Sequence, residues 1–225
     1  MKIGIIVAMR KELALLLPLL SNPSSESHDG LEFHTGTIGS NQVIAMQCGI
    51  AKVNAAIGTV TLINHYAPSL IINSGVAGGT DKSVNVMDIV VGSRVAYHDV
   101  WCGPESTYGA VQGLPLYYEA DKHASQLVSD DKTVKKGLIV SGDQFVDSIE
   151  QVKIIKSHFP DALAVDMESG AIAQVCELRN VPFMSMRVIS DSPGASHDNT
   201  KQYNDFWNDA PAATFNVLHN LLLKI

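Results

Sequence analysis

Acidic side chains follow several apolar, strand-length runs in this sequence. Asp166 and Glu168 flank Met167 immediately after one run, Glu12 comes three residues after another, and Asp191 comes two residues after a third. Carboxyl groups can act as general acids or bases, and a carboxylate can accept hydrogen bonds from two sugar hydroxyls at once. A glutamate in a first helical turn is also favoured by the helix dipole alone, and an aspartate in the sequence SDSPG suits an ordinary turn. The acids alone therefore leave a catalytic and a purely structural interpretation open.

Three other kinds of site have little support. The segment HDVWC at 98–102 contains metal-ligating residue types, but no second cluster lies at ligand spacing. The stretch GVAGG at 75–79 suits a tight turn and fits neither the dinucleotide fingerprint nor a P-loop. No G-x-S-x-G elbow of a serine hydrolase is present. We therefore expect chemistry that needs no metal or organic cofactor.

Composition narrows the class of protein. The chain has 225 residues, of which 46% are hydrophobic, which is enough for one full core, so we expect a single domain over residues 1–225. The net charge is −7 without any basic run, which argues against a nucleic-acid partner. The apolar runs are too short for membrane spans and the first residues lack a signal-peptide layout, so we expect no membrane partner and a cytoplasmic location. Three widely spaced cysteines argue against a disulfide framework.

Two periodicities alternate along the chain and predict the elements that must position the acids. The order of strand and helix patterns predicts the α/β class, as a single-domain three-layer α/β/α fold with a central mixed, twisted sheet. The turn-rich segment 21–30 is expected to introduce an antiparallel hairpin of 31–39 with 41–48. The predicted strands are 2–9, 43–48, 70–74, 88–97, 137–141, 162–165 and 182–189, and the predicted helices are 10–20, 51–66, 148–158, 168–179 and about 203–223.

The acids fall at the ends of these strands. In an open α/β sheet the ligand lies beyond the carboxyl ends of the strands, where loops meet and helix N-termini point their positive ends. The strand ends in this chain carry Glu12, the glycine-rich stretch 75–79, the sequence SGDQF at 141–145, the Asp166–Glu168 pair and Asp191. We therefore expect one ligand site at this edge of the sheet.

Seven sequence stretches, in order, resemble one family. The whole chain is similar to the methylthioadenosine/S-adenosylhomocysteine nucleosidases of the purine nucleoside phosphorylase-like superfamily. The stretches that carry the resemblance are MKIGIIVAMRKEL at 1–13, GIAKVNAA at 49–56, INSGVAGG at 72–79, DIVVGSRVAYHD at 88–99, GLIVSGDQFVDS at 137–148, AVDMESGAIAQVC at 164–176 and VPFMSMRVISDS at 181–192. The resemblance implies a nucleoside phosphorylase-like fold and hydrolysis of an adenine nucleoside to adenine and a free thioribose.

The resemblance also implies roles for individual residues. Asp191 matches the family's aspartate that binds adenine at N6 and N7 and protonates N7, and Glu12 matches the glutamate that activates the attacking water. Glu168 would accept hydrogen bonds from the two ribose hydroxyls, with Met167 against the sugar. Asp166 matches an acid of the family, but we assign it no catalytic step. The remaining implied binding residues are Phe145 as the partner that stacks on the base, Val146 through its backbone, Arg187 and Ser190 as supporting residues, Tyr203 over the purine, and Val76 and Ile50.

Alternatives remain open at this point. A phosphorylase needs a basic phosphate pocket after the first strand, where this chain has VAMRKE at 7–12; the acid favours water, although Arg10 leaves phosphorolysis possible. The loop 98–115, with Trp101 and Cys102, departs from the family pattern, so the 5'-substituent is unsettled and a futalosine hydrolase is a further alternative. A nucleoside-binding or storage protein of the same fold is the non-enzyme alternative. The resemblance and the apolar helix 51–66 also imply a homodimer.

Overall fold

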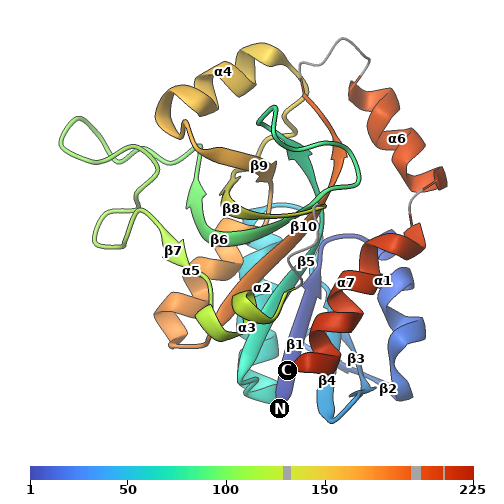
Figure 1. Cartoon of the computed structure of the whole chain (residues 1–225). Helices are drawn as coiled ribbons and strands as arrows, with labels where there is room; N and C mark the ends of the chain where they lie inside the picture. Colours follow the sequence, from blue (N-terminus) through green and yellow to red (C-terminus); the bar gives the residue numbers. More distant parts are fainter. Residues whose placement is uncertain (129–132, 194–198, 210) are drawn as a thin grey trace.

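A computed structural model describes residues 1–128, 133–193, 199–209 and 211–225, with the backbone alone at 208, 209 and 211–214. It contains a mixed sheet of ten strands with helices on both faces (Figure 1). The strands are β1 (Lys2–Val7), β2 (Ser21–His28), β3 (Leu31–Ile38), β4 (Asn41–Gln47), β5 (Leu70–Gly79), β6 (Ile89–Tyr97), β7 (Tyr118–Glu119), β8 (Val134–Ser141), β9 (Ala162–Asp166) and β10 (Phe183–Asp191). The helices are α1 (Arg10–Leu16), α2 (Lys52–Tyr66), α3 (Lys122–Leu127), α4 (Ile149–His158), α5 (Ser169–Arg179), α6 (Asn199–Asp209) and α7 (Pro211–Lys224), with a 3-10 turn at Leu17–Leu19. The predicted α/β class and mixed sheet are confirmed.

The sheet closes on itself over part of its width. Its strand order is β10-β6-β8-β9-β5-β1-β4-β3-β2, and β10 also pairs in parallel with β5. Five strands therefore form a ring, from which β1, β4, β3 and β2 extend as an open sheet. The predicted hairpin is confirmed, since β3 and β4 pair antiparallel with Ile38 opposite Asn41. The ring brings the carboxyl ends of β5, β8, β9 and β10 close together.

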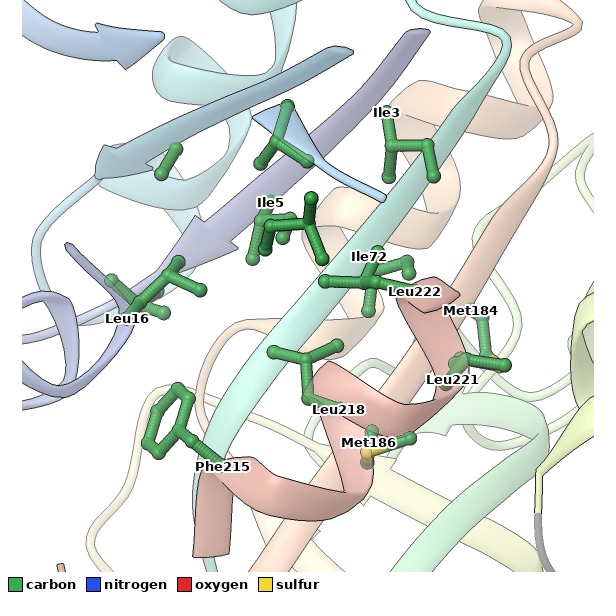
Figure 2. Close-up of a cluster of buried hydrophobic side chains, with 14 of the residues drawn as sticks. Ile3, Ile5, Leu16, Ile72, Met184, Met186, Phe215, Leu218, Leu221 and Leu222 are labelled. Atoms are coloured by element: carbon green, nitrogen blue, oxygen red, sulfur yellow. The ribbon is translucent and has the colours of Figure 1, made fainter. Parts of the chain in front are cut away.

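Strand β1 shows why its sequence folds as a doubly covered strand. Ile3 and Ile5 are fully buried in one hydrophobic cluster, with residues of α1 and α7, whereas Ile6 is buried in a second cluster, with residues of α2 and α5. Successive side chains of a strand point to opposite faces, so a continuous apolar run supplies both clusters. Figure 2 shows the first cluster, in which Leu218 and Leu222 of α7 lie close to Ile5 and Ile72. Each fully buried side chain of this kind contributes about 1.5–3 kcal/mol.

The predicted helix 10–20 was too long, and the single closing helix was wrong. α1 ends at Leu16 because Pro18 has no N–H to donate and its ring clashes with the preceding turn. The closing segment contains two helices, α6 and α7, and α7 begins at Pro211. Proline is well suited to the first position of a new helix and poorly suited to the interior of a long one.

Two strands also differ from the expectation. Residues 21–28 form strand β2, whose side chains are almost wholly exposed and which pairs through its backbone with β3. The stretch 75–79, expected to be a turn, continues β5 as far as Gly79, and Gly78 pairs with both Val165 and Asp191. The small residues of this stretch therefore serve close packing around the strand ends.

Candidate active site

All of the site residues predicted from the sequence line one open pocket at the carboxyl ends of β1, β5, β8, β9 and β10. The empty space in and in front of the pocket is about 610 Å³, which includes open solvent. The predicted residues in its lining are Glu12, Ile50, Val76, Phe145, Val146, Met167, Glu168, Arg187, Ser190, Asp191 and Tyr203. Residues in the lining that the sequence did not single out include Met9, Ala77, Gly78 and Gln144.

Glu12 is a buried residue of the pocket lining, held by three backbone N–H groups. Only 1% of its surface is exposed, and its Oε2 accepts hydrogen bonds from the backbone N–H groups of Ala8 and Met9 at 2.9 and 2.8 Å. Its Oε1 accepts a third from Val76 N at 3.1 Å. Burial raises the pKa of Glu12, against the lowering effect of Arg187 and of these three N–H groups. A buried carboxyl with a raised pKa is suited to take up a proton.

Arg187 is the cation around which the acids are arranged. It is 1% exposed, and its Nε lies 2.7 Å from Asp166 Oδ2, while its Nη2 lies 3.5 Å from Glu168 Oε2. Burial alone would lower the pKa of Arg187, but Asp166, Glu168 and Glu12 outweigh burial and raise it. One guanidinium thus faces three carboxyl groups. This imbalance favours a proton on at least one of them.

Gly75 of β5 leaves room for the side chains of Arg187 and Glu12, which lie close to its backbone. A Cβ at this position would lie 2.5 Å from Glu12 Oε1 and 2.6 Å from Arg187 Nη1. Any side chain at 75 would therefore displace the buried charges. The sequence predicted a tight turn at this glycine, whereas the structure shows a close approach of two functional side chains.

Asp166 supports the site without occupying a catalytic position. Its Oδ1 accepts hydrogen bonds from the N–H groups of Glu168 and Ser169 at 3.3 and 3.2 Å, and its Oδ2 accepts from Ser169 Oγ and from Arg187. Asn73 Oδ1 accepts a further hydrogen bond from Arg187 Nη2. Asn73 and Ser169 were missed in the sequence. The available signal was a polar residue inside an apolar strand run, because a buried polar group needs a partner.

Glu168 precedes the helix that was expected to contain it. It is the N-cap residue of α5, which begins at Ser169. Its Oε1 accepts a hydrogen bond from Ala51 N at 3.0 Å, and it is 5% exposed. Burial first and the neighbouring Asp166 next raise the pKa of Glu168 to about 7, although Arg187 lowers it. Burial therefore favours the protonated form of Glu168 more than it is favoured in an exposed glutamate.

Asp191 is the last residue of β10 and lines the same pocket. It is 2% exposed, and its Oδ1 accepts a hydrogen bond from Ser190 Oγ at 2.5 Å. Burial raises the pKa of Asp191, and the hydrogen bonds from Ser190 and Asn199 oppose that shift. Asp191 can therefore carry a proton into the pocket. Glu12, Glu168, Asp191 and Arg187 together form what we call the carboxylate side of the pocket.

Another part of the lining is aromatic and more exposed. Phe145 is 47% exposed, and its ring meets the ring of Tyr203 from α6 edge-on, with centroids 5.6 Å apart. The Tyr203 hydroxyl lies 3.3 Å from Met9 Sδ, which ties α6 to the end of β1. Val146 is buried beside them. We call Phe145, Val146 and Tyr203 the aromatic side of the pocket; an exposed ring of this kind can stack on a flat ligand.

The unusual loop at 98–115 does not line the pocket within this chain. Trp101 is 61% exposed, and Cys102 is exposed with a free thiol. Tyr108 anchors the loop, because its ring stacks on His158 and its hydroxyl donates to His98 O at 2.7 Å. In the described part of the chain, no group of three or more metal-ligating side chains could hold a metal ion.

Comparisons with known proteins identify the family of the chain. The family model of the phosphorylase superfamily matches residues 2–222. The 5'-methylthioadenosine/S-adenosylhomocysteine nucleosidase of Staphylococcus aureus (strain MRSA252) is 45% identical over 197 residues, which cover 84% of this chain and 86% of that protein. The solved structure of the corresponding nucleosidase from S. pneumoniae, with the transition-state inhibitor MT-ImmA, has a TM-score of 0.94 and 37% identity, covering 99% of each chain. S-adenosylhomocysteine nucleosidase from Streptococcus pyogenes, in complex with 5-methylthiotubericidin, has a TM-score of 0.94 and 33% identity, covering 100% of this chain and 97% of that one. This chain therefore belongs to the phosphorylase superfamily and, within it, to the 5'-methylthioadenosine/S-adenosylhomocysteine nucleosidases.

Proposed function

We propose that this protein hydrolyses the N-glycosidic bond of 5'-methylthioadenosine and S-adenosylhomocysteine, releasing adenine and the free thioribose. The observation that carries the proposal is the convergence of three buried carboxyl groups, those of Glu12, Glu168 and Asp191, on one pocket with an aromatic wall. Cleavage of such a bond needs a protonated leaving base, a stabilised oxocarbenium-like sugar and a positioned water. The three acids can supply these needs separately.

Asp191 is proposed as the general acid. The raised pKa of its buried carboxyl keeps a proton available for N7 of adenine, and the Ser190 hydroxyl fixes one of its oxygens. Protonation at N7 lets adenine leave as a neutral base. Gly78 lies beside the other oxygen, since a Cβ there would be 3.4 Å from Asp191 Oδ2.

Glu12 is proposed to activate the attacking water. Its oxygens are fixed by three backbone N–H groups, and burial raises the pKa of its carboxyl, so the ionised form is a stronger base than an exposed glutamate. The water would then attack the sugar on the face opposite to the departing base.

Glu168 is proposed to bind the ribose hydroxyls, with Met167 against the sugar. Ala51 N donates to Glu168 Oε1 and Arg187 Nη2 lies 3.5 Å from Oε2, and a carboxylate with these two neighbours keeps further lone pairs for two hydroxyl donors. Phe145 would stack on adenine, the Val146 backbone would read its edge, and Tyr203 would cover it. Ile50 and Val76 complete the wall around the sugar and its 5'-substituent.

Water is favoured over phosphate as the nucleophile. Arg187 is the one cationic side chain among the described residues of the lining, and it is already engaged by Asp166 and Glu168. Arg10 is exposed and does not line the pocket. An incoming phosphate would meet Glu12 without a free cation, and like charges repel strongly at a buried site.

A product assay tests the proposal. The protein would be incubated with methylthioadenosine, S-adenosylhomocysteine, adenosine and inosine, each with and without phosphate, and free base and sugar would be quantified by chromatography. We expect adenine and free thioribose from the thioethers in the absence of phosphate. Base release that requires phosphate would identify a phosphorylase, and binding without release would identify a nucleoside-binding protein.

We also propose that the protein is a homodimer. Val53 and Ile57, four residues apart on α2, are 69% and 53% exposed, and Ile50 at the mouth of the pocket is 49% exposed. An apolar helix face of this kind favours burial against another surface, and a second copy would bury it symmetrically. Sedimentation should give a dimer for the wild type and a monomer for Val53→Glu; a monomeric wild type would contradict this part of the proposal.

The cellular setting is a further proposal. We infer that the enzyme acts in the cytoplasm, in methionine salvage and in the removal of methyltransfer by-products. Cys48, Cys102 and Cys176 are free thiols, as is usual in a reducing compartment. In the described residues, no helix is both long and apolar enough to cross a membrane. Cell fractionation and growth on methylthioadenosine as the sulfur source would test these two statements.

A further inference from the structure

Lys52 lies between two aspartates from distant parts of the chain, outside the lining of the pocket. Its Nζ is 3.0 and 2.9 Å from the two carboxylate oxygens of Asp99 and 3.8 Å from Asp143 Oδ2. Two backbone N–H groups also bind these carboxylates. Lys52 N donates to Asp143 Oδ1 and Asp143 N donates to Asp99 Oδ2, both at 2.8 Å. We call these three residues the Lys52 cluster. It ties together the start of α2, the segment after β6 and the segment after β8.

Two members of the cluster are close neighbours of pocket residues. Lys52 directly follows Ala51, whose N–H donates to Glu168 on the carboxylate side at 3.0 Å. Asp143 comes two residues before Phe145 on the aromatic side. Ala51 has φ +79°, a conformation that non-glycine residues rarely adopt without support from their surroundings. The cluster therefore links the two sides of the pocket at a strained point of the backbone.

The backbone next to Asp99 is held in place by hydrogen bonds. The preceding residue, His98, is buried, its N–H donates to Ser141 O at 3.0 Å, and its carbonyl accepts from the Tyr108 hydroxyl at 2.7 Å. The side chains of Lys52 and Asp99 are only 23% and 16% exposed. A partly buried ion pair joined by several hydrogen bonds is far better defined than an isolated surface pair.

We propose that the Lys52 cluster is a positioning element, which sets the separation between Glu168 and the Phe145–Val146 segment so that one nucleoside can contact both. This inference rests on the proposed function, because it takes Glu168 as the sugar-binding group and Phe145 as the base-binding group. Free adenine would contact the aromatic side and Asp191 but not Glu168, whereas a nucleoside must also reach Glu168. Loss of the cluster should therefore weaken nucleoside binding more than adenine binding.

The test compares Lys52→Met with Lys156→Met. Lys156 is a matched control, since its Nζ lies 2.6 Å from Asp81 Oδ2, its side chain is also 23% exposed, and it does not line the pocket. Calorimetry would give the Kd of adenine and of a 7-deaza analogue of methylthioadenosine, which cannot be protonated at N7. We expect Lys52→Met to weaken the analogue about tenfold or more and adenine less than about threefold, because small displacements of positioning groups are costly.

Several outcomes would overturn the inference. Unchanged affinity for the analogue in folded Lys52→Met would do so, as would equal losses for adenine and the analogue or an equal effect of Lys156→Met. Lys52→Arg should restore most of the affinity, because it keeps the charge between the aspartates. If Lys52→Met fails to fold, Asp99→Asn serves as the second variant, since it keeps the shape and an acceptor for Asp143 N. If the wild type bound the analogue but released no adenine from methylthioadenosine, the proposed function would be refuted and this inference would stand.

Discussion

The two sides of the pocket are built in opposite ways. On the carboxylate side, Glu12 and Asp191 are 1% and 2% exposed, backbone N–H groups hold both oxygens of Glu12, and the Ser190 hydroxyl holds one oxygen of Asp191. On the aromatic side, Phe145 is 47% exposed. Groups that move protons need shifted pKa values, which burial provides, and a group that stacks on a base needs only a free face. The contrast suggests that the carboxylate side governs the rate and the aromatic side governs affinity for the base.

The largest expected effect is that of Asp191→Asn. The amide keeps the shape of the side chain but cannot deliver the proton, so kcat should fall by about 10²–10⁴-fold while nucleoside binding is largely retained. Steady-state adenine release and calorimetric Kd values would be measured on the same preparation. Turnover at the wild-type rate would remove Asp191 from its role.

Glu12→Gln should stop hydrolysis to a similar extent. The amide is nearly isosteric but is not a base, so kcat should fall by about 10²–10⁴-fold with little change in the affinity for adenine. Turnover in the presence of added phosphate would be measured in parallel. A variant that gained phosphate-dependent cleavage would show that the charge of Glu12 excludes phosphate, whereas unchanged hydrolysis would contradict the assignment.

Glu168→Gln should separate sugar binding from base binding. A hydrogen bond to a charged group is worth about 1.5–3 kcal/mol, so nucleosides with both ribose hydroxyls should bind about ten- to hundredfold more weakly. Free adenine should bind as it does to the wild type. The measurement is the inhibition constant of adenine beside that of a nucleoside analogue, and equal losses for the two ligands would refute the sugar-binding role.

Phe145→Ala probes the aromatic side. Stacking of a base on an aromatic side chain is worth about 1–3 kcal/mol, so adenine and nucleosides should lose affinity together while kcat changes little. Ile154→Ala on α4 is a suitable control, because Ile154 is 58% exposed and does not line the pocket. If Phe145→Ala lowered kcat and left affinity intact, the division between the two sides would be wrong.

The smallest expected effect is on the pH dependence of the free energy of unfolding. An unfolded glutamate ionises near its ordinary pKa of 4.5, whereas burial raises the pKa of Glu168 to about 7. The folded state therefore keeps a proton that the unfolded state has released, so the free energy of unfolding falls as pH rises from about 4.5 to 7. Glu168→Gln should flatten this fall in calorimetric melting curves, and the exposed Glu105→Gln should not. A fall of equal steepness in Glu168→Gln would contradict the raised pKa.

The sequence predicted the pocket better than it predicted the periphery. Strand β1 and the segment Asp166–Glu168 carry strong local signals, because apolar runs that are covered on both faces end there in polar groups. Strand β2 carries no such signal, since its side chains are exposed and only its backbone pairs with β3. The support that Asn73 gives to Arg187 depends on two strands meeting in space, which no local pattern reveals.

The most direct measurement of the central claim is single-turnover adenine release from methylthioadenosine, in phosphate-free buffer at saturating enzyme, for wild type, Asp191→Asn and Phe145→Ala. We predict rapid release by the wild type, release slowed by at least about a hundredfold in Asp191→Asn, and a rate close to that of wild type in Phe145→Ala once enzyme is in excess. Equal single-turnover rates for wild type and Asp191→Asn, or equal slowing in both variants, would contradict the claim that the buried carboxylates perform the chemistry and the aromatic side performs the binding.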